Sequence, residues 1–595
     1  MTVTSASDHQ QLVDQVVLPL LIGVTGHRDI PPEDIPGLKD LVRTIIDQIK
    51  SEYPTTPLML MSALADGADR LAAEVALDAG VALIASLPMN QEIYEQDFSA
   101  DSINQFQKLL KHAAFTYELP IENKNSKKSV NVGDTARDFQ YLAVGRFIVK
   151  HCQVLIALWD GVTDGPTGGT SQVVRMQLEG VDPLCSDGSE LFSALPTGPV
   201  YFVPTRRSTY SEVAQDTEFL KRHLRNFDGL ENVQIMYPLS DDGKSTRDEE
   251  HMRTLSCVER FNRDSNQSRQ LTHFEFGRKQ AASYLIAEDS ASIIRSDLSL
   301  PAQCLLNCYA HTDCLAQQFQ KKTYNVLLLL ASLVPFIVFF FETYSNVTTA
   351  LIAISGYLLF LGLAYGLYFV TRHQGNQEKF LDYRALAEGL RVCFFWRLAG
   401  IRKDSASFYL NKQQSELDWI SYAIRTWNLL AYRGSVDPAT SQMIDTVKKN
   451  WLEDQKKYFE RNAQNHKSHA DYLNRLAAFF FRLGFFAVTP AMLIIHGMKL
   501  GGERLDPWMQ VATPLTFVIA GSLKFYSEQM LYAEQAKQYA RMYAVFTKSI
   551  QLLDAAGEDQ LLRQEIIFAV GKEALAENGE WVLMHRERPI EVPQG

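Results

Sequence analysis

Two long apolar segments that follow one another closely most restrict how this chain can fold. They run from Asn325 to Phe341 and from Thr349 to Val370, and only Glu342 to Thr348 separate them. Each is close to the length of about 20 residues that a helix needs to cross the hydrocarbon core of a bilayer. The short connection leaves room for little more than a tight turn. The sequence therefore predicts a hairpin of two transmembrane helices.

A second, less apolar pair of segments lies further along the chain. The segment Leu476–His496 contains Arg482, and the segment Trp508–Tyr526 carries Lys524 near its end. Two buried core helices of a soluble domain are the alternative interpretation. Because the hairpin spacing is repeated, and because an arginine near a helix end can extend to the membrane surface, we expect a second transmembrane hairpin.

The basic residues around these segments predict an orientation. Lys321 and Lys322 precede the first pair and Arg372 and Lys379 follow it, whereas the loop between the two segments contains neither Lys nor Arg. Short segments rich in Lys and Arg stay in the cytosol. The second pair is also flanked by basic residues. We therefore expect a multi-pass protein of the inner cell membrane, with both hairpin turns outside and the N- and C-termini in the cytosol.

Length and composition exclude several other classes of protein. A chain of 595 residues is too long for one hydrophobic core, so we expect at least two domains. The net charge of −11 gives no electrostatic reason to expect nucleic acid as a partner. The first residues include an acid before any apolar run and lack a basic segment, so we expect no signal peptide. Seven scattered cysteines suit a reducing compartment rather than a disulfide framework.

Four residues ahead of the first apolar segment have a spacing that zinc sites use. They are Cys304, Cys308, His311 and Cys314. The segment leads into a predicted membrane helix, and its first three members share one helical face, where cysteine packs well as a small apolar residue. Zinc binding is the alternative, and we expect no metal here.

The N-terminal part alternates short apolar runs with helical patterns. Continuous apolar runs bounded by turn residues are typical of buried parallel strands, and their alternation with helices predicts a doubly wound parallel sheet. Ligands of such sheets bind at the carboxyl ends of the strands. The predicted strands are Leu18–Gly26, Leu58–Met61, Val81–Leu87, Val154–Gly161 and Val200–Pro204.

The loops at these strand ends predict a phosphate-binding site when they are taken together. Gly26, Ser62, Asp160 and Gly168 all fall there, in turns of small residues that begin helices. Such turns leave backbone N–H groups free for phosphate. The first strand is followed by neither a Walker A lysine nor a G-x-G-x-x-G motif, so no single loop identifies the ligand.

Four motifs carry a resemblance to a known family. T-G-H-R-D, S-x-L-A-D-G-A-D-R, L-W-D-G and G-G-T resemble the SLOG superfamily over about residues 17–240. This superfamily includes the DprA- and LOG-type proteins and the N-terminal regions of melastatin-type TRP channels. Several members sense nucleotides or NAD-derived signals. The resemblance implies an α/β Rossmann-like domain that binds such a ligand.

The resemblance also implies which residues face the ligand, in three loops. The alternative is a structural role, in which the glycines form turns and Asp66 or Asp69 caps a helix. The implied ligand-binding residues are Gly23, Thr25, Gly26 and Arg28 in the first loop, Ser62, Asp66, Gly67 and Asp69 in the second, and Asp160, Gly161, Gly168, Gly169 and Thr170 in the third.

One departure from the family argues against catalysis. LOG-type hydrolases carry a glutamate three residues after the threonine of their glycine-rich loop, and the corresponding residue after Thr170 is Val173. Valine cannot act as a general acid or base. We therefore expect no catalytic residues. The alternative is a membrane-anchored nucleotide hydrolase of the LOG type, an N-glycosidase that uses Glu92 and Asp97 as a carboxylate pair.

The C-terminal half resembles a second family. A two-helix hairpin is followed by D-Y-R-x-L-A-E-x-L-R from Asp382, W-L-E-D-Q-x-x-Y from Trp451 and E-N-G-E-W from Glu577. This arrangement is similar to the SLATT family of bacterial membrane effectors over about residues 305–595. The resemblance implies a pore-forming or membrane-perturbing effector in nucleotide-linked antiviral systems. A hairpin followed by an amphipathic helix occurs twice, which indicates a divergent internal duplication.

The expected protein is a ligand-gated membrane effector. Its α/β Rossmann-like domain binds a nucleotide or NAD-derived ligand, with no other cofactor, and rearranges an all-α membrane domain of two hairpins. A hairpin pair is too small to enclose a pore alone, so we expect a homo-oligomer in contact with membrane lipid. The expected divisions are a tail (1–16), the SLOG-like domain (17–240), linker helices (241–320), the first hairpin (321–371), a cytosolic helical region (372–470), the second hairpin (471–527) and a C-terminal cytosolic helical region (528–595).

Overall fold

The computed structural model describes most of the chain as two compact units. Unit 1 comprises the described residues up to Leu271 together with those of the segment 411–432, and unit 2 comprises the rest. The tail expected at residues 1–16 lies outside the described residues except for Val16. The described residues are 16–121, 130, 135–184, 195–209, 217–225, 233–239, 248–286, 298–409, 417–431, 439–498 and 502–588.

Unit 1 is built on one sheet, in which the described residues form eight strands in the order β4-β3-β2-β1-β5-β6-β8-β7. The pairs among β1 to β6 are all parallel, and β8 runs antiparallel to both of its neighbours. The strands are β1 (Leu20–Gly26), β2 (Leu58–Ser62), β3 (Ala82–Leu87), β4 (Phe115–Glu118), β5 (Val154–Trp159), β6 (Val200–Pro204), β7 (Leu224–Arg225) and β8 (Gln234–Met236).

The strand order reverses beside β1, and this fixes where a ligand can bind. The chain adds β2, β3 and β4 on one side of β1 and then places β5 and β6 on the other. At such a switch point the loops after the two central strands separate and leave a crevice at their carboxyl ends. The crevice lies between the loops that follow Gly26 and Trp159. The predicted parallel α/β domain is therefore confirmed.

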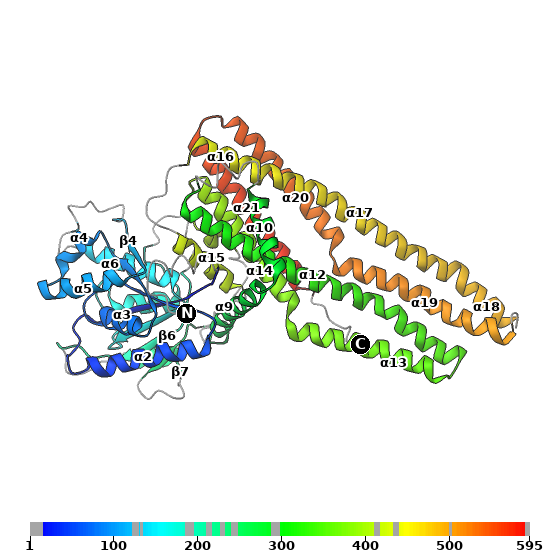
Figure 1. Cartoon of the computed structure of the whole chain (residues 1–595), viewed down its shortest axis with the longest axis horizontal. Helices are drawn as coiled ribbons and strands as arrows, with labels where there is room; N and C mark the ends of the chain where they lie inside the picture. Colours follow the sequence, from blue (N-terminus) through cyan, green and yellow to red (C-terminus); the bar gives the residue numbers. More distant parts are fainter. Residues whose placement is uncertain are drawn as a thin grey trace. The chain divides into compact units, whose positions relative to one another are not determined.

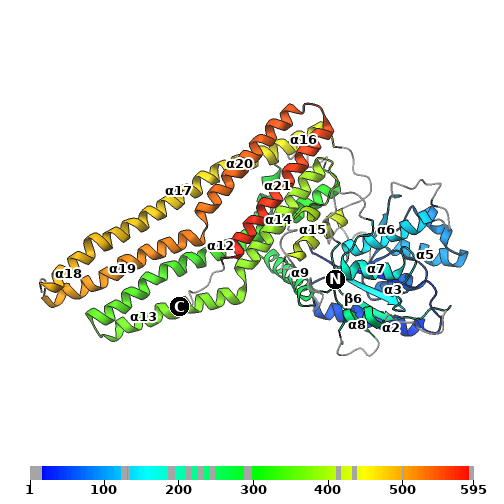
Figure 2. The same cartoon turned by 180° about the vertical axis from the view of Figure 1, so that it is seen from behind.

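Helices cover both faces of this sheet. One apolar core holds Val42 and Ile45 of α2 with Leu71 of α3, and the other holds Leu142 of α6 with Val174 of α7. Figures 1 and 2 show α2 and α6 on opposite sides of the strands. The helices of unit 1 are α2 (Ile35–Glu52), α3 (Ala68–Asp78), α4 (Gln91–Tyr94), α5 (Ala100–His112), α6 (Thr135–His151), α7 (Thr170–Glu179), α8 (Thr217–His223), α9 (Asp248–Arg269) and α15 (Asp418–Ala431), with a 3₁₀ turn η1 (Glu95–Asp97).

Two helices that lie outside the expected 17–240 domain complete unit 1. On α9, the side chain of Asn262 accepts a hydrogen bond from the backbone N–H of Leu18 and donates one to its carbonyl, each 2.9 Å long. On α15, the Tyr422 hydroxyl donates to the Pro19 carbonyl, and the Trp427 ring lies 5.6 Å from Phe261 of α9. No sequence pattern predicted that a segment after the first hairpin belongs to the N-terminal unit.

All the regular elements among the described residues of unit 2 are helices. Its longest helix, α12, joins a largely buried first half, which includes His311 and Asp313, to the first apolar segment without a break. The elements are α10 (Thr272–Leu285), α12 (Leu300–Glu342), η3 (Thr343–Val347), α13 (Leu351–Gln374), α14 (Asn376–Leu398), η4 (Ser405–Phe408), α16 (Ser441–Val447), η5 (Lys448–Glu453), α17 (Asp454–Leu483), η6 (Gly484–Val488), α18 (Thr489–Gly497), α19 (Gly502–Gln529), α20 (Tyr532–Ala555) and α21 (Gln560–Arg586).

The helices of unit 2 repeat one arrangement. In the first copy α12 packs on α13 and α14, and in the second α17 packs on α19 and α20. The returning helix of each copy ends at a residue in the left-handed region, Gly375 with φ 59° and Leu531 with φ 53°, before the next helix begins. A left-handed residue ends a helix and redirects the chain. The repeated order of elements supports the expected internal duplication.

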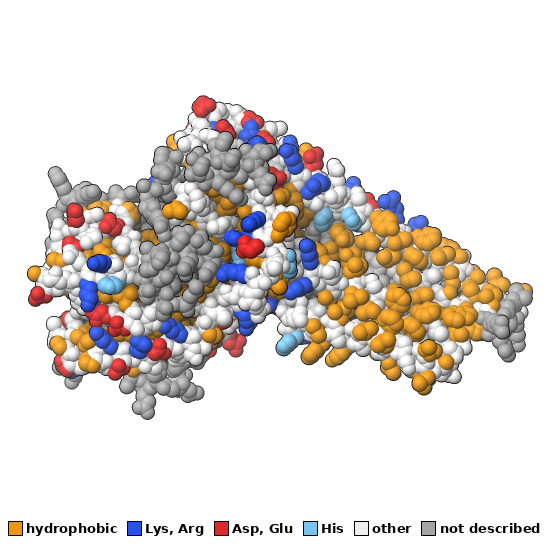
Figure 3. Space-filling model, viewed as in Figure 1, with side chains coloured by type: hydrophobic (Ala, Val, Ile, Leu, Met, Phe, Trp, Pro, Cys, Tyr) orange, Lys and Arg blue, Asp and Glu red, His pale blue; other side chains and the backbone are white. Residues whose placement is uncertain are grey.

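Four long helices of unit 2 lie side by side in the order α13, α12, α19 and α17 (Figures 1 and 2). Hydrophobic side chains cover their surface, and Lys and Arg gather at its border (Figure 3). Among the described residues, three helices are long and apolar enough to cross a membrane: Leu300–Val347, Leu351–Gln374 and Ser441–Gly497. The fourth expected segment lies in α19, which is not among them and carries Thr513, Thr516 and Lys524 among its apolar residues.

Candidate functional site

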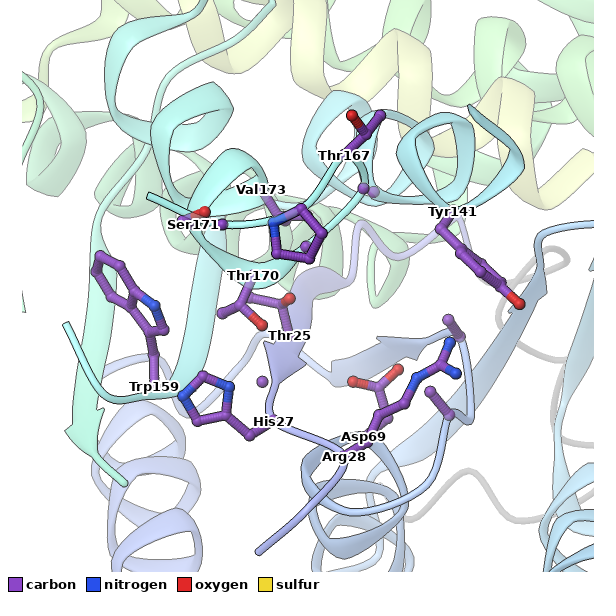
Figure 4. Close-up of a pocket in the computed structure, with 18 of the residues that line it drawn as sticks. Thr25, His27, Arg28, Asp69, Tyr141, Trp159, Thr167, Thr170, Ser171 and Val173 are labelled. Carbon is purple, nitrogen blue, oxygen red and sulfur yellow. The ribbon is translucent and has the colours of Figure 1, made fainter. Parts of the chain in front are cut away.

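A cavity of about 690 Å³ opens at the carboxyl ends of the central strands of unit 1. The loops after β1, β2, β5 and β6 and the side of α6 form its walls. Figure 4 shows Arg28, Asp69 and Tyr141 at one end and Trp159 and Ser171 at the other. Its volume falls in the range of about 300–1,000 Å³ that small-molecule sites occupy.

Glycines bring the first two loops into direct contact. Gly67 has φ +78°, and a Cβ there would lie 2.4 Å from the His27 carbonyl oxygen and 2.5 Å from that of Arg28. The backbone N–H of Ala68 donates to the same His27 carbonyl over 3.0 Å. A side chain at Gly26 would meet Ala68 Cβ at 2.4 Å. The loop after β2 therefore packs directly against the backbone of the loop after β1. Only glycine at position 67 permits this close approach.

His27 joins the first loop to the third. Its imidazole Nε2 accepts a hydrogen bond of 2.9 Å from the Asp160 backbone N–H and lies 3.3 Å from the Asp160 carboxylate. Burial lowers the pKa of His27, so the neutral ring is favoured. The Asp160 carboxylate also receives the guanidinium of Arg207 at 3.2 Å, from the loop after β6. Three loops are thus fixed to one another across the switch point.

Asp69 forms a buried acidic group at the cavity wall. It stands in the first turn of α3, and backbone N–H groups of Ala65 and Ala63 donate to its carboxyl. Burial raises the pKa of Asp69 to about 7, against the opposing effect of those N–H groups and of Arg28. The carboxyl therefore changes its protonation state near neutral pH, which makes it a candidate to contact a ligand hydroxyl.

Arg28 is the exposed guanidinium of the cavity that lacks an ion pair. No carboxylate of a described residue lies within 4.0 Å of it, and its guanidinium carbon lies 5.0 Å from the centre of the Tyr141 ring. The other two arginines of the cavity differ. Arg206 pairs with Asp34 at 2.6 Å and Arg207 pairs with Asp160. The Arg28 guanidinium hydrogen-bonds the Tyr141 side chain and acts on Asp69 and Asp97 only at longer range, so its charge lacks a direct carboxylate partner among the described residues.

The N-terminus of α7 supplies a second anion-binding element. Gly169 is its N-cap residue and makes no side-chain capping bond, and Thr170 and Ser171 of its first turn face the cavity. Uncapped N–H groups and the helix dipole both favour a bound anion. Gly168, with φ +77°, packs so closely on α6 that a Cβ would lie 2.8 Å from the backbone nitrogen of Leu142.

The expected ligand-binding residues divide into two groups. Those that line the cavity are Thr25, Gly26, Arg28, Asp69, Asp160, Gly168, Gly169 and Thr170. Gly23, Ser62, Asp66, Gly67 and Gly161 do not line it.

The second group holds the loops and helices in place. A Cβ at Gly23 would lie 2.7 Å from Ile148 of α6. The Ser62 hydroxyl accepts from the Leu64 backbone N–H, and Asp66 pairs with Arg70 at 2.6 Å, toward α5. Gly67 makes the close approach described above, and Gly161 has φ 83° in the turn after β5.

Several residues that line the cavity were not among the ligand-binding residues predicted from the sequence. His27 and Asp29 belong to the T-G-H-R-D motif, and Arg206 and Arg207 follow the predicted strand Val200–Pro204. The rule that ligands bind at the carboxyl ends of parallel strands would have selected all four. Tyr141 projects from the middle of α6, and no local signal marks it.

The two carboxylates of the hydrolase alternative do not line this cavity. Glu92 is exposed on α4. Asp97 is bound by Arg137 at 2.8 Å and by the Tyr141 hydroxyl. Val173, at the place of the hydrolase glutamate, is buried and faces Gly145 of α6. Glu92 and Asp97 therefore lie outside the cavity, whereas Val173 lines it.

Comparisons with known proteins do not identify a relative. No protein-family model and no curated protein matches this chain.

Proposed function

We propose that this protein is a ligand-gated membrane effector whose unit 1 binds a nucleotide or NAD-derived ligand in the cavity at the sheet switch point. One observation carries the ligand class. The unpaired cation of Arg28 and the uncapped N-terminus of α7 open into the same cavity. A phosphate group suits both elements. The buried Asp69 is suited to a ribose hydroxyl. The resemblance of the loop motifs to the SLOG superfamily supports the same ligand class.

We propose further that unit 2 is a multi-pass membrane domain of two hairpins, α12–α13 and α17–α19, with both termini in the cytosol. Exposed large apolar side chains support this, since Leu351 and Ile352 are 82% and 78% exposed and Phe486 is 73% exposed. A soluble surface rarely shows such a continuous apolar area. α19 packs against α12 and α17 as the fourth helix of the row.

The proposed output is a pore or a local disruption of the bilayer. Ligand binding changes the relative stability of two states of the membrane helices, which requires tighter binding to one state, and such coupling is typically about 1–3 kcal/mol. Two hairpins enclose no pore alone, so a homo-oligomer is proposed. The SLATT-like motifs support a role in bacterial antiviral defence.

The ligand is tested by calorimetry on the full chain in detergent micelles. The panel contains nucleoside phosphates, NAD, ADP-ribose and cyclic dinucleotides. At least one is expected to bind, and Arg28→Gln is expected to weaken it about ten-fold, because a charge-assisted hydrogen bond is lost. Arg175→Gln, on the exposed face of α7, is the matched control. Binding that is equal in both variants, or absent across the panel, would contradict the proposed site.

The output is tested in liposomes that contain the full chain and a trapped dye. Ligand-dependent release that Arg28→Gln abolishes supports the effector. Steady release with or without ligand contradicts gating. Consumption of the ligand without release would favour the hydrolase alternative.

The topology is tested by labelling with a membrane-impermeant thiol reagent in cells. A cysteine at Thr348, in the exposed turn of the first hairpin, should react from outside. A cysteine at Lys572, on the exposed face of α21, should react only after the cells are opened. External labelling of the Lys572 position would overturn the arrangement.

A further inference from the structure

A second cavity, of about 750 Å³, lies inside unit 2. Helices α10, α12, α14, α17, α20 and α21 all contribute to its wall. Three motifs that are far apart in the sequence meet there. D-Y-R-x-L-A-E-x-L-R contributes Arg384, W-L-E-D-Q-x-x-Y contributes Tyr458, and E-N-G-E-W contributes Glu577. The proposed gating mechanism assigns no role to the charged and polar residues that line this cavity.

Arg384 presents unused donors to the cavity. Its Nη1 lies 2.8 Å from the Asp313 carboxylate, whose other oxygen accepts from the Gln317 side chain at 2.7 Å. The remaining guanidinium nitrogens have no hydrogen-bond partner among the described residues. The Arg384 side chain keeps 31% of its accessible surface, and it lines the cavity. Arginine in this situation is suited to a planar pair of anionic oxygens.

Arg391 lies two turns further along α14 on the same face. It pairs with Glu388, and its Nε is buried without any partner. Its side chain is only 7% exposed. A buried donor without an acceptor costs free energy. The cavity wall therefore carries one partly buried arginine, Arg384, and one buried arginine, Arg391, and the described residues leave donors of both without a partner.

Positive charge also exceeds negative charge around the cavity. The cations that line it are four, Lys321, Arg384, Arg391 and Arg461, and the carboxylates are three, Asp313, Glu388 and Glu577. Lys321 and Arg461 are exposed, with no carboxylate of a described residue within 4.0 Å of either.

Glu577 does not offset this excess. No hydrogen bond to its carboxyl is present among the described residues, although the residue is 9% exposed. Burial raises the pKa of Glu577 to about 8, and Glu388 opposite it on α14 adds to the effect. Arg384 and Arg391 oppose the shift, and Glu580 on its own helix adds to it. At neutral pH the carboxyl is therefore mostly protonated, which leaves the cations in larger excess.

We propose that this cavity is a second ligand site, which binds a phosphate-bearing anion between the guanidinium of Arg384 and the mouth cations Lys321 and Arg461. Tyrosine hydroxyls and side-chain amides supply further neutral donors around it. They include Tyr309, Tyr324, Tyr458, Gln320 and Gln455.

Two sources offer this chemistry, an anionic lipid headgroup and a free phosphorylated molecule. Lys321 and Tyr324 directly precede the apolar segment Asn325–Phe341, so on the proposed membrane topology the cavity lies at the depth of lipid headgroups. Lys and Arg gather along the border of the hydrophobic surface of unit 2 (Figure 3). A soluble phosphate would enter from the aqueous side of the same mouth.

The test uses the full chain in micelles of an uncharged detergent and measures binding by calorimetry. The probes are glycerol 3-phosphate, short-chain phosphatidylglycerol, and short-chain phosphatidylcholine as the zwitterionic control. Binding of phosphatidylglycerol alone assigns a lipid headgroup. Binding of glycerol 3-phosphate as well assigns a soluble phosphate. Binding of neither anion overturns the proposal.

Variants locate the bound anion. Arg384→Lys keeps the charge beside Asp313 but loses the guanidinium fork, and it should weaken binding about ten-fold. Lys321→Gln and Arg461→Gln, at exposed positions, should each weaken it about three-fold. Lys548→Gln removes an exposed charge of α20 outside the cavity and should change nothing.

Two further variants separate this site from the cavity of unit 1. Arg28→Gln should leave the signal unchanged, because Arg28 lies in the other unit. Glu577→Gln should preserve binding as the pH rises past about 8, whereas the unsubstituted chain should lose affinity there. An anion signal that disappears with Arg28→Gln and survives Arg384→Lys would overturn the second site and leave the proposed function of unit 1 intact.

Discussion

The Nε2 atom of His27 accepts the backbone N–H of Asp160 over 2.9 Å while Asp160 holds Arg207 by its carboxylate. An imidazole nitrogen that accepts a hydrogen bond carries no proton, so the ring is neutral with its hydrogen on Nδ1. The His27 side chain thus adds to the backbone bond from His27 N–H to the Leu158 carbonyl, and together they join the loops after β1 and β5 at the cavity wall.

His27→Ala should destabilise the protein by about 1–3 kcal/mol, because the Asp160 N–H loses its acceptor. His27→Gln, whose amide oxygen can accept, should retain most of the stability. Burial lowers the pKa of His27, so its contribution is present above the ordinary value of 6.5 and is lost as the pH falls below it. Urea unfolding between pH 5 and 8 measures the free energy of unfolding of the unsubstituted chain and of His27→Gln. The difference between the two values should become smaller as the pH falls. A constant difference would show that the ring does not titrate as described.

Asp69→Asn should remove a pH dependence of folding stability whose sign is opposite to that expected from His27. The pKa of Asp69 is raised by burial from 3.8 to about 7, with Arg28, Arg70 and Tyr94 facing the carboxyl. The stabilising contribution of a group with a raised pKa is present below the unfolded value and is lost as the pH rises through the folded value. The stability of the unsubstituted chain relative to Asp69→Asn should therefore fall between about pH 4 and pH 7. Thermal unfolding of the pair at several pH values measures it, and parallel curves would refute the shift.

Gly169→Glu should reduce ligand affinity by about ten-fold or more. It places a carboxylate at the N-terminus of α7, where phosphate is proposed to bind, and like charges repel. The φ of −77° suits any residue, but a Cβ there would lie 3.0 Å from the Pro166 carbonyl oxygen, so the turn must shift by a few tenths of an ångström to accept it. Gly37→Glu adds the same charge on α2 with nothing within 4 Å and is the control. Calorimetry with any ligand found in the panel compares the two, and equal affinities would place phosphate elsewhere.

Trp427→Ala should unfold or strongly destabilise unit 1, by about 3–5 kcal/mol, although the residue lies far from the sheet in sequence. Trp427 is 2% exposed, its ring lies against Phe261, and its Nε1 donates to the Val17 carbonyl over 3.5 Å. Phe276→Ala removes an aromatic ring that is 72% exposed and should have little effect. Limited proteolysis and tryptophan fluorescence report the difference. Similar resistance of the two variants would show that α15 adds no stability to unit 1.

The sequence predicted the centre of the sheet well and its edges poorly. The central strands are covered on both faces, so they read as continuous apolar runs, and Val200–Pro204 was predicted to the residue. Strand β4, F-T-Y-E, alternates between buried and exposed residues over only four positions. β7 and β8 are shorter still. Short edge strands carry too little pattern to separate them from loops.

The candidate site was predicted where its residues act through local backbone, and not where they act through tertiary contacts. Gly169 and Thr170 stand at the start of a helix, and the glycine-rich loop before it predicts that position. Asp66 belongs to the same motif as Asp69, yet Asp66 points to Arg70 and α5 whereas Asp69 lines the cavity. Spacing alone cannot decide which of two carboxylates in one turn faces a ligand. Tyr141 depends on the packing of a whole helix.

The chain passes between the two units three times, once after Leu271, once before α15 and once after it. An exchange of genes at a single junction therefore cannot transplant unit 1 intact. A sheet domain that ended near Leu271 would arrive in a new host protein without Trp427 and Tyr422, and the receiving protein would lack the helix that covers it. To move unit 1 into another protein, recombination must transfer two segments at once, the residues up to Leu271 and the segment that contains α15. We expect descendants of this protein to keep both units together or to rebuild α15 from another segment.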